Sequence, residues 1–363
     1  MRALAVLAWL LALTGAAAAA EPPSGPADFP AVRKDRPLRF PADYGAHPEY
    51  RTEWWYITGW LEDAAGRARG FQVTFFRVRT GIGEDNPSRF APRQLILAHA
   101  AVADPAAGRL LHAERSERAL DPLAGAAVGR TRAWIGDWRL EGDGDRYRAR
   151  IEADTFAFDL QFDAAGPPVP NGERGFSQKA PDPVNASYYY SRPQLAVAGT
   201  LRLGDARHAV RGRAWLDHEW SSELLPAGAS GWDWVGINLH DGGALMAFRM
   251  RGRDGETLWT AATTVSAQGE TTLPPRERIR FVPLRRWRSP RTGAEYPVEW
   301  RIGIGDRSLE LRPLMDDQEL DARPSTGALY WEGAVRVFAA GEEGGEIGRG
   351  YLEMTGYGGR PPL

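Results

Sequence analysis

The stretch AWLDHEWSS, residues 214–222, places an acid, a histidine and a second acid in a row between two tryptophans. Side chains alternate along a β-strand, so Trp215, Asp217 and Glu219 are expected on one face. His218 is then expected on the opposite face. An acid held against an aromatic ring in a dry pocket has a raised pKa and can protonate a substrate. An ion pair that closes the end of a barrel accounts for the same row of residues, and this stretch alone leaves both interpretations open.

A second group of polar and aromatic residues is HPEYRTEWWY, residues 47–56. Glu53 and Trp55 alternate with Trp54 and Tyr56, so aromatic rings are expected on both faces of this strand. The chain has 14 tryptophans, more than the packing of two small barrels requires. The surplus fits either the lining of an apolar or sugar-like ligand site or an aromatic interface between barrels. Ring faces in such a site can stabilise a carbocation by about 0.5–2 kcal/mol each.

Several catalytic signatures are absent from the sequence. GASGW lacks the second glycine of a G-x-S-x-G elbow, and HEWSS has Ser222 where the second histidine of H-E-x-x-H belongs. The chain has no cysteine and six histidines, none paired at a ligand spacing, so we expect no metal site. No glycine-rich phosphate loop is present, and no cofactor is expected. Lys plus Arg number 45 and Asp plus Glu 47, so no nucleic-acid partner is expected.

The first residues have the layout of a secretory signal peptide, predicted for residues 1–20. Arg2 precedes a short apolar run and then a block of alanines, so cleavage is expected near Ala20. The apolar run is shorter than the ~20 residues that a spanning helix needs, and no transmembrane segment is expected after cleavage. These features predict a periplasmic or secreted protein. Residues 21–36, rich in proline, alanine and charge, are expected to form an unstructured leader.

Beyond this leader, short aromatic and β-branched runs alternate with Gly, Asp and Pro turns, which predicts an all-β fold of antiparallel strands. The two halves of the chain also resemble each other. EWWYITGWL has an echo in GWDWVGINL, and GRAWLD has an echo in GRGYLE. We therefore predict a duplicated β unit, with one barrel at residues 37–224 and a second at residues 225–363. The echo aligns Asp217 with Glu353.

Three separated motifs resemble a known family: FPADYGAHPEYRTEWWYITGWL, AWLDHEWSS with GWDWVGINL, and YWEGAVRVF with GRGYLEMTGY. They resemble the AttH-type secreted hydrolases, which share a lipocalin-like superfamily with the bacterial carotenoid 1,2-hydratases (hydroxyneurosporene synthases). The resemblance covers about residues 40–358 and implies two tandem lipocalin-like antiparallel β-barrels of the calycin type. It also implies acid-catalysed hydration or hydrolysis of an apolar isoprenoid or lipid, and work beside an ABC-type export system.

In the hydratase branch, an aromatic-x-Asp motif is among the residues thought essential, and by position it matches Trp215 and Asp217. The upstream histidine of that branch has no counterpart near Tyr188–Tyr190. The resulting hypothesis makes Asp217 the acid and Trp215 and Trp54 cation-stabilising walls, with His218 or Glu53 orienting water. The residues expected to line the ligand site are Trp54, Trp55, Tyr56, Tyr189, Trp232 and Trp234. The alternative is a carrier or accessory protein of an export complex, which binds the apolar ligand without chemistry.

Overall fold

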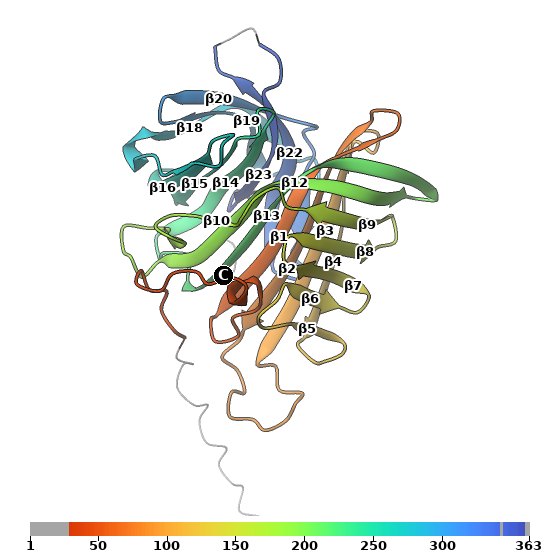
Figure 1. Ribbon diagram of the computed structural model, residues 1–363, viewed down its shortest axis with the longest axis vertical. Helices are drawn as coiled ribbons and strands as arrows, with labels where there is room; N and C mark the ends of the chain where they lie inside the picture. The colour runs from red at the N-terminus through yellow and green to blue at the C-terminus, as the bar shows by residue number, and fades with distance from the viewer. Residues whose placement is uncertain (1–28, 342–343, 360–363) are drawn as a thin grey trace, which may run out of the picture.

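The computed structural model describes residues 29–341 and 344–359, so the predicted signal peptide lies outside the described residues. The described chain forms two antiparallel sheets, one of 13 and one of 10 strands, and two short 3-10 helices, η1 (Ala42–Tyr44) and η2 (Arg276–Arg278) (Figure 1). Within this part of the chain, no helix is long and apolar enough to cross a membrane. The two sheets curl into a nearly closed barrel and a half-barrel. The prediction of two tandem lipocalin-like β-barrels is confirmed.

The larger sheet contains the first half of the chain in the order β4-β3-β2-β1-β13-β12-β9-β8-β7-β6-β5, with β10 and β11 paired to β12. Its end strands β4 and β5 lie close together, which nearly closes the barrel. The strands are β1 (Thr52–Asp63), β2 (Ala68–Arg79), β3 (Gln94–Asp104), β4 (Arg109–Arg118), β5 (Ala124–Ala126), β6 (Arg132–Ile135), β7 (Trp138–Asp143), β8 (Arg146–Glu152), β9 (Phe156–Asp163), β10 (Val169–Pro170), β11 (Phe176–Gln178), β12 (Ala186–Leu203) and β13 (Ala206–Glu223).

The smaller sheet contains the second half in the order β17-β16-β15-β14-β23-β22-β20-β19-β18, with β21 paired to β22. Its strands are β14 (Ala229–Leu239), β15 (Ala244–Gly252), β16 (Thr257–Val265), β17 (Thr271–Thr272), β18 (Ile279–Arg288), β19 (Glu295–Ile304), β20 (Arg307–Pro313), β21 (Glu319–Ala322), β22 (Ala328–Ala339) and β23 (Gly348–Thr355). The boundary predicted between residues 224 and 225 lies in the connection from β13 to β14.

In the larger sheet, most of β1 and residues 214–222 of β13 are buried on both faces. One face carries Trp55, Leu216 and Trp220 into the core of the first barrel. The opposite face carries Tyr56 and Trp215 into a separate aromatic cluster, where they pack against residues of the smaller sheet. Because alternate residues of a strand point to opposite faces, neighbouring residues of one strand serve two different environments.

The pairing register supports the predicted duplication. In the larger sheet Tyr56 of β1 lies opposite Asp217 of β13. In the smaller sheet Trp234 of β14 lies opposite Glu353 of β23. Each acid therefore lies opposite an aromatic residue on the first strand of its own half. This agrees with the alignment of Asp217 and Glu353 in the sequence.

The part of the predicted leader that the structure describes, residues 29–36, forms no strand but packs against the first barrel. Val32 is buried, and the backbone N–H of Arg33 donates to the Tyr188 hydroxyl at 2.8 Å. The Ser222 hydroxyl donates to the carbonyl of Pro30 at 2.7 Å. These contacts correct the expectation that this segment is unstructured, because a proline-rich composition does not reveal a docking surface formed by distant strands.

Candidate active site

A cavity of about 290 Å³ lies between the two sheets rather than inside either barrel. Strands β1, β2, β3 and β13 line one side, and β14, β15, β22 and β23 line the other. Most of the wall is apolar or aromatic. The apolar and aromatic lining includes Trp54, Tyr56, Phe76, Val78, Leu95, Leu97, Trp232, Trp234, Phe248 and Met250. Four carboxyl groups also reach it, those of Asp217, Glu219, Glu332 and Glu353. The duplicated halves thus share one site.

Asp217 is held in this wall by neutral hydrogen-bond donors. The Tyr189 hydroxyl donates to Oδ2 at 2.6 Å, and the Ser191 hydroxyl donates to Oδ1 at 2.6 Å. The indole N–H of Trp215 also donates to Oδ1 at 2.6 Å. The indole N–H of Trp234, from the smaller sheet, donates to the Tyr189 hydroxyl at 3.0 Å and so braces this arrangement across the interface.

The surroundings of Asp217 suit it to proton transfer. It is only 3% exposed, and burial raises its pKa from 3.8 to about 7, although hydrogen bonds from Ser191, Tyr189 and Trp215 oppose the rise. A carboxyl group with a pKa near neutrality holds a proton and can release it at physiological pH. Such a group at the wall of an apolar cavity can act as a general acid.

The neighbouring Glu219 has a different role, because it is already paired. The Lys179 ammonium lies 2.7 Å from Glu219 Oε1, and the Ser187 hydroxyl donates to the same oxygen. Lys179 also lies over the ring of Phe248, 4.4 Å from its centroid, and over that of Tyr189 at 4.9 Å. Because Lys179 and Ser187 already occupy this oxygen, Glu219 is less available than Asp217 to a substrate.

The second half of the molecule contributes a pair of carboxyl groups to the same cavity. Glu332 of β22 lies directly opposite Glu353 of β23 in the strand register. The indole N–H of Trp232 donates to Glu353 Oε1 at 2.9 Å. Burial raises the pKa of Glu353 to about 7, opposed by this hydrogen bond and reinforced by the charge of Asp217. The acids of the two halves are therefore close enough to influence each other.

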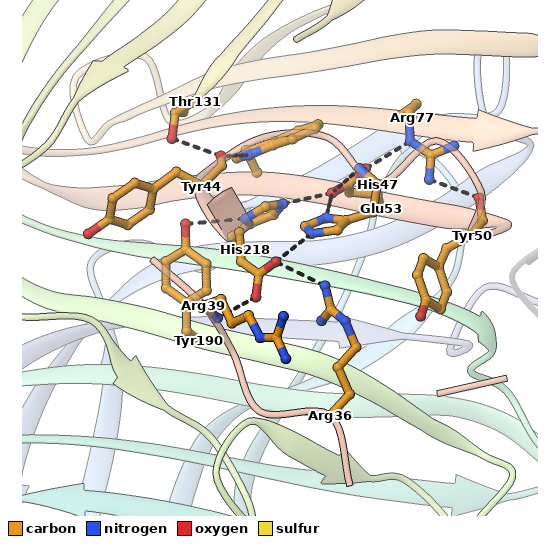
Figure 2. Close-up of polar contacts among 12 residues, drawn as sticks. Arg36, Arg39, Tyr44, His47, Tyr50, Glu53, Arg77, Thr131, Tyr190 and His218 are labelled. Carbon is orange, nitrogen blue, oxygen red and sulfur yellow. Dashed lines mark hydrogen bonds and ion pairs between the residues drawn. The ribbon is translucent and has the colours of Figure 1, made fainter. Parts of the chain in front are cut away.

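On the opposite face of β1 and β13, inside the first barrel, Glu53 is the centre of a buried network. Figure 2 shows His47, His218 and Arg77 directed at this carboxylate. Glu53 Oε1 lies 2.7 Å from His47 Nδ1 and 2.9 Å from His218 Nε2. Arg77 Nε donates to Oε2 at 2.8 Å, and the backbone N–H of His47 donates to the same oxygen at 2.9 Å.

His47 connects two carboxylates in this network. Its Nδ1 faces Glu53 and its Nε2 lies 3.1 Å from Asp43 Oδ1, so the ring donates from both nitrogens as an imidazolium. Burial favours the neutral ring, but the hydrogen bonds to Asp43 and Glu53 outweigh it and raise the pKa of His47. Burial likewise favours the neutral acid at Glu53, but the two histidines and Arg77 lower its pKa.

His218 is a neutral member of the network. Its Nε2 donates to Glu53, its Nδ1 lies 3.2 Å from the Tyr190 hydroxyl, and its ring stacks on Trp55 at 4.7 Å. Burial lowers the pKa of His218 despite the nearby carboxylate.

One potential ligand atom from each of His47, Glu53 and His218 lies within 4.8 Å of the other two, a proximity that the spacing of histidines in the sequence does not reveal. The guanidinium on Glu53 and the doubly donating His47 fit an ion network better than a metal site.

The structure divides the predicted site residues among three places. Lining the cavity are Asp217, Trp54, Tyr56, Trp232 and Trp234. Trp215 and Tyr189 donate hydrogen bonds to Asp217 and do not line the cavity, so Trp215 is a support and not the cation-stabilising wall that we predicted.

The remaining three predicted residues, Glu53, Trp55 and His218, lie on the opposite face of the sheet. Neither His218 nor Glu53 can therefore orient water beside Asp217, and Trp55 is not a wall of the cavity. Sequence reasoning also missed Ser191, Lys179 and Glu332 as parts of the site. Ser191 directly follows Tyr188–Tyr190, and Glu332 lies within the motif YWEGAVRVF, whereas nothing in the sequence points to Lys179.

A model of the family described as AttH-like matches residues 31–357 of the chain. The crystal structure of a protein assigned as an AttH from Nitrosomonas europaea superposes with a TM-score of 0.84 at 47% sequence identity. That similarity covers 91% of this chain and 100% of the other. No curated protein sequence matches the chain.

Two more distant solved structures share the fold. Kievitone hydratase from Nectria haematococca has a TM-score of 0.66 at 16% identity, over 91% of this chain and 96% of its own. CghA, solved with Sch210972, has a TM-score of 0.56 at 15% identity, over 85% of this chain and 88% of its own.

Proposed function

The chain belongs to the AttH-like family, and from this premise we propose that it is a hydratase-like enzyme that adds water to a carbon–carbon double bond of an apolar substrate. The observation that carries the proposal is Asp217, a buried acid with a pKa of about 7 at the wall of a largely apolar cavity. Kievitone hydratase, which shares the fold, is named for a hydration. The low identity to that enzyme limits the comparison to fold, so the chemistry rests on the residues of this chain.

In the proposed reaction, the proton of Asp217 adds to one alkene carbon and leaves a cation on the other. The oxygen of a water molecule then attacks the cation, and the proton that this water releases restores the acid form of Asp217. The rings of Trp54, Trp232 and Trp234 face the same cavity and are placed to stabilise the cation. Tyr189, Ser191 and Trp215 hold the carboxyl group in one orientation throughout.

The test begins with the ligand. The purified protein is incubated with a lipid extract, and the molecules that remain bound are identified by mass spectrometry. Each identified alkene is then incubated with the protein in isotopically labelled water, and the expected product is heavier by one labelled water molecule.

Asp217→Asn keeps the shape of the side chain but cannot deliver a proton, so turnover is expected to fall by about 10²–10⁴-fold. Glu219→Gln, on the same face but ion-paired to Lys179, is the matched comparison and should lose less activity. Full activity in Asp217→Asn would exclude Asp217 as the acid.

A second candidate function is that of a carrier or accessory protein of an ABC-type export complex. The cavity itself favours it, because a space of about 290 Å³ lined mainly by apolar groups can hold a lipid without chemistry. For a carrier, Asp217→Asn retains ligand binding and no labelled product forms with the wild-type protein. The experiment with labelled water therefore separates the two functions.

We also propose that the protein is exported and acts in the periplasm or outside the cell. The support is the signal-like layout of its first 20 residues. N-terminal sequencing of the mature protein is expected to start at Glu21, and an intact Met1 in the mature protein would contradict export with cleavage.

A further inference from the structure

The carboxyl pair of the second half has hydrogen-bonding capacity that no described residue uses. Glu332 is 2% exposed and Tyr56 is 4% exposed, and both line the cavity. Within residues 29–341 and 344–359, neither Glu332 Oε1 nor the Tyr56 hydroxyl has a hydrogen-bond partner. The two groups are near enough for Tyr56 to oppose the raised pKa of Glu332, but they do not meet in hydrogen-bonding geometry. Unpartnered polar groups are rare in a protein interior.

In the first half of the chain, the residue equivalent to Glu332 makes a hydrogen bond to the neighbouring acid. Ser191 lies opposite Asp217 on β12 and β13, and its hydroxyl donates to Asp217. Glu332 lies opposite Glu353 at the corresponding place on β22 and β23. An acid thus replaces a hydroxyl beside the second acid. Two facing carboxyl groups repel each other when both are ionised, so the pair favours holding a proton.

We propose that Glu332, Tyr56 and Glu353 form a polar subsite that binds an oxygen-bearing group of the ligand, a hydroxyl or a carbonyl. This inference rests on the proposed function and narrows its substrate to an apolar alkene with one oxygenated end. The double bond then lies beside Asp217, and the oxygen lies at the carboxyl pair of the other half.

The chemistry of the cavity favours a neutral oxygen over an ammonium group. Burial and the charge of Glu353 raise the pKa of Glu332. A carboxyl group that keeps its proton can donate to a carbonyl or hydroxyl oxygen, and its other oxygen can accept from a hydroxyl. The one described cation that lines the cavity, Lys179, is already paired with Glu219.

The test compares two probes that differ in one oxygen, farnesol and the hydrocarbon farnesene. Both are titrated into the full-length mature protein at pH 7, and binding is followed by tryptophan fluorescence, since Trp54 and Trp232 line the cavity. The wild-type protein is expected to bind farnesol about tenfold more tightly than farnesene, the effect of one or two hydrogen bonds. Glu332→Leu should reduce this ratio to about one.

Three further variants control the result. Glu332→Gln retains hydrogen bonding and should keep the preference, whereas Tyr56→Phe should weaken it. The comparison of Glu332→Gln with Tyr56→Phe tests the subsite even if Glu332→Leu does not fold. Glu310→Leu removes a surface acid that pairs with Arg301 and should leave the ratio unchanged.

The binding ratio is measured without turnover, so a protein that hydrates nothing can still confirm the subsite. Asp217→Asn, which removes the proposed acid, should keep the preference for farnesol. The subsite is refuted if the wild-type protein binds neither probe or shows no preference, or if Glu332→Leu keeps the preference. Tighter binding of farnesylamine than of farnesol, lost in Glu332→Leu, would identify an ammonium site and overturn the assignment.

Discussion

Asp217 and Glu53 are buried carboxyl groups on neighbouring strands, and they differ in the charge of their partners. Asp217 accepts hydrogen bonds from Tyr189, Ser191 and Trp215, all neutral, and burial raises its pKa to about 7. Around Glu53, burial is opposed by hydrogen bonds from His218 and His47 and by the charge of Arg77, and its pKa is lowered. Burial therefore leaves a movable proton where every partner is neutral, whereas cationic partners such as Arg77 hold an equally buried carboxyl group as a fixed charge.

The largest difference that we predict between the two sites is in the free energy of unfolding of their variants. Glu53→Gln removes the charge that Arg77 and His47 share in the barrel core, and breaking a buried ion pair costs about 3–5 kcal/mol. Asp217→Asn keeps neutral partners around a neutral side chain and should change the free energy of unfolding much less. Urea unfolding of both variants at pH 7 measures the difference. An equal loss in the two variants would mean that Asp217 is also a structural group.

The next effect is the pH dependence of stability, which has opposite signs at the two sites. The pKa of Asp217 rises from 3.8 to about 7 on folding, so the stability it contributes is present at low pH and is lost as pH rises from about 4 to 7. The pKa of Glu53 falls from 4.5 on folding, so its contribution is present above about pH 4.5 and is lost as pH falls below it. Each pKa unit corresponds to about 1.4 kcal/mol.

Unfolding of the variants across pH 3–9 checks this sign. Asp217→Asn should reduce the loss of stability between about pH 4 and 7, although Glu353, with a pKa of about 7, retains part of it. Glu53→Gln should instead reduce the loss at acid pH. If the free energy of unfolding depended on pH in the same way in both variants, the two carboxyl groups would not differ in the direction of their pKa shifts.

The smallest predicted effect concerns the support of Asp217. Trp215→Phe removes a hydrogen bond that lowers the pKa of Asp217, so that pKa should rise by about one unit, about 1.4 kcal/mol. The pH–rate profile of the hydration, or infrared titration of the carboxyl group, reports this shift. Trp234→Phe is the control, because its indole reaches Asp217 only through Tyr189 and should shift the pKa less. A larger shift in Trp234→Phe would mean that Tyr189 dominates the support.

Strand alternation was enough to predict which residues share a face. It correctly separated Asp217 and Glu219 from His218, and the repeat correctly aligned Asp217 with Glu353. These inferences depend only on the two-residue period of a strand and on the similarity of two segments. They need no knowledge of which strands pair.

The location of the cavity and the Glu53 network could not be predicted, because both depend on contacts between distant segments. His47 reaches Glu53 because the chain turns at residues 47–50, and Arg77 reaches it because β2 pairs with β1. The cavity forms where the two curled sheets meet, and the sequence does not show how the two sheets pack against each other. The sequence also does not show which face of β1 meets the cavity. Trp55 was therefore predicted to line the ligand site together with Trp54, but only Trp54 does so.

The adjacency of Asp217 and His218 on β13 has a consequence for how this family can diverge. A shift of this strand by one residue would turn the histidine into the cavity and bury the acid among the cationic donors of the barrel. Deletions or insertions of a single residue near Trp215–Trp220 would therefore exchange the two environments at once. Family members that keep the acid in the cavity and the histidine in the barrel should therefore tolerate length changes within this strand only in pairs of residues. Single-residue changes should occur beyond the end of the strand, in the connection at residues 224–228.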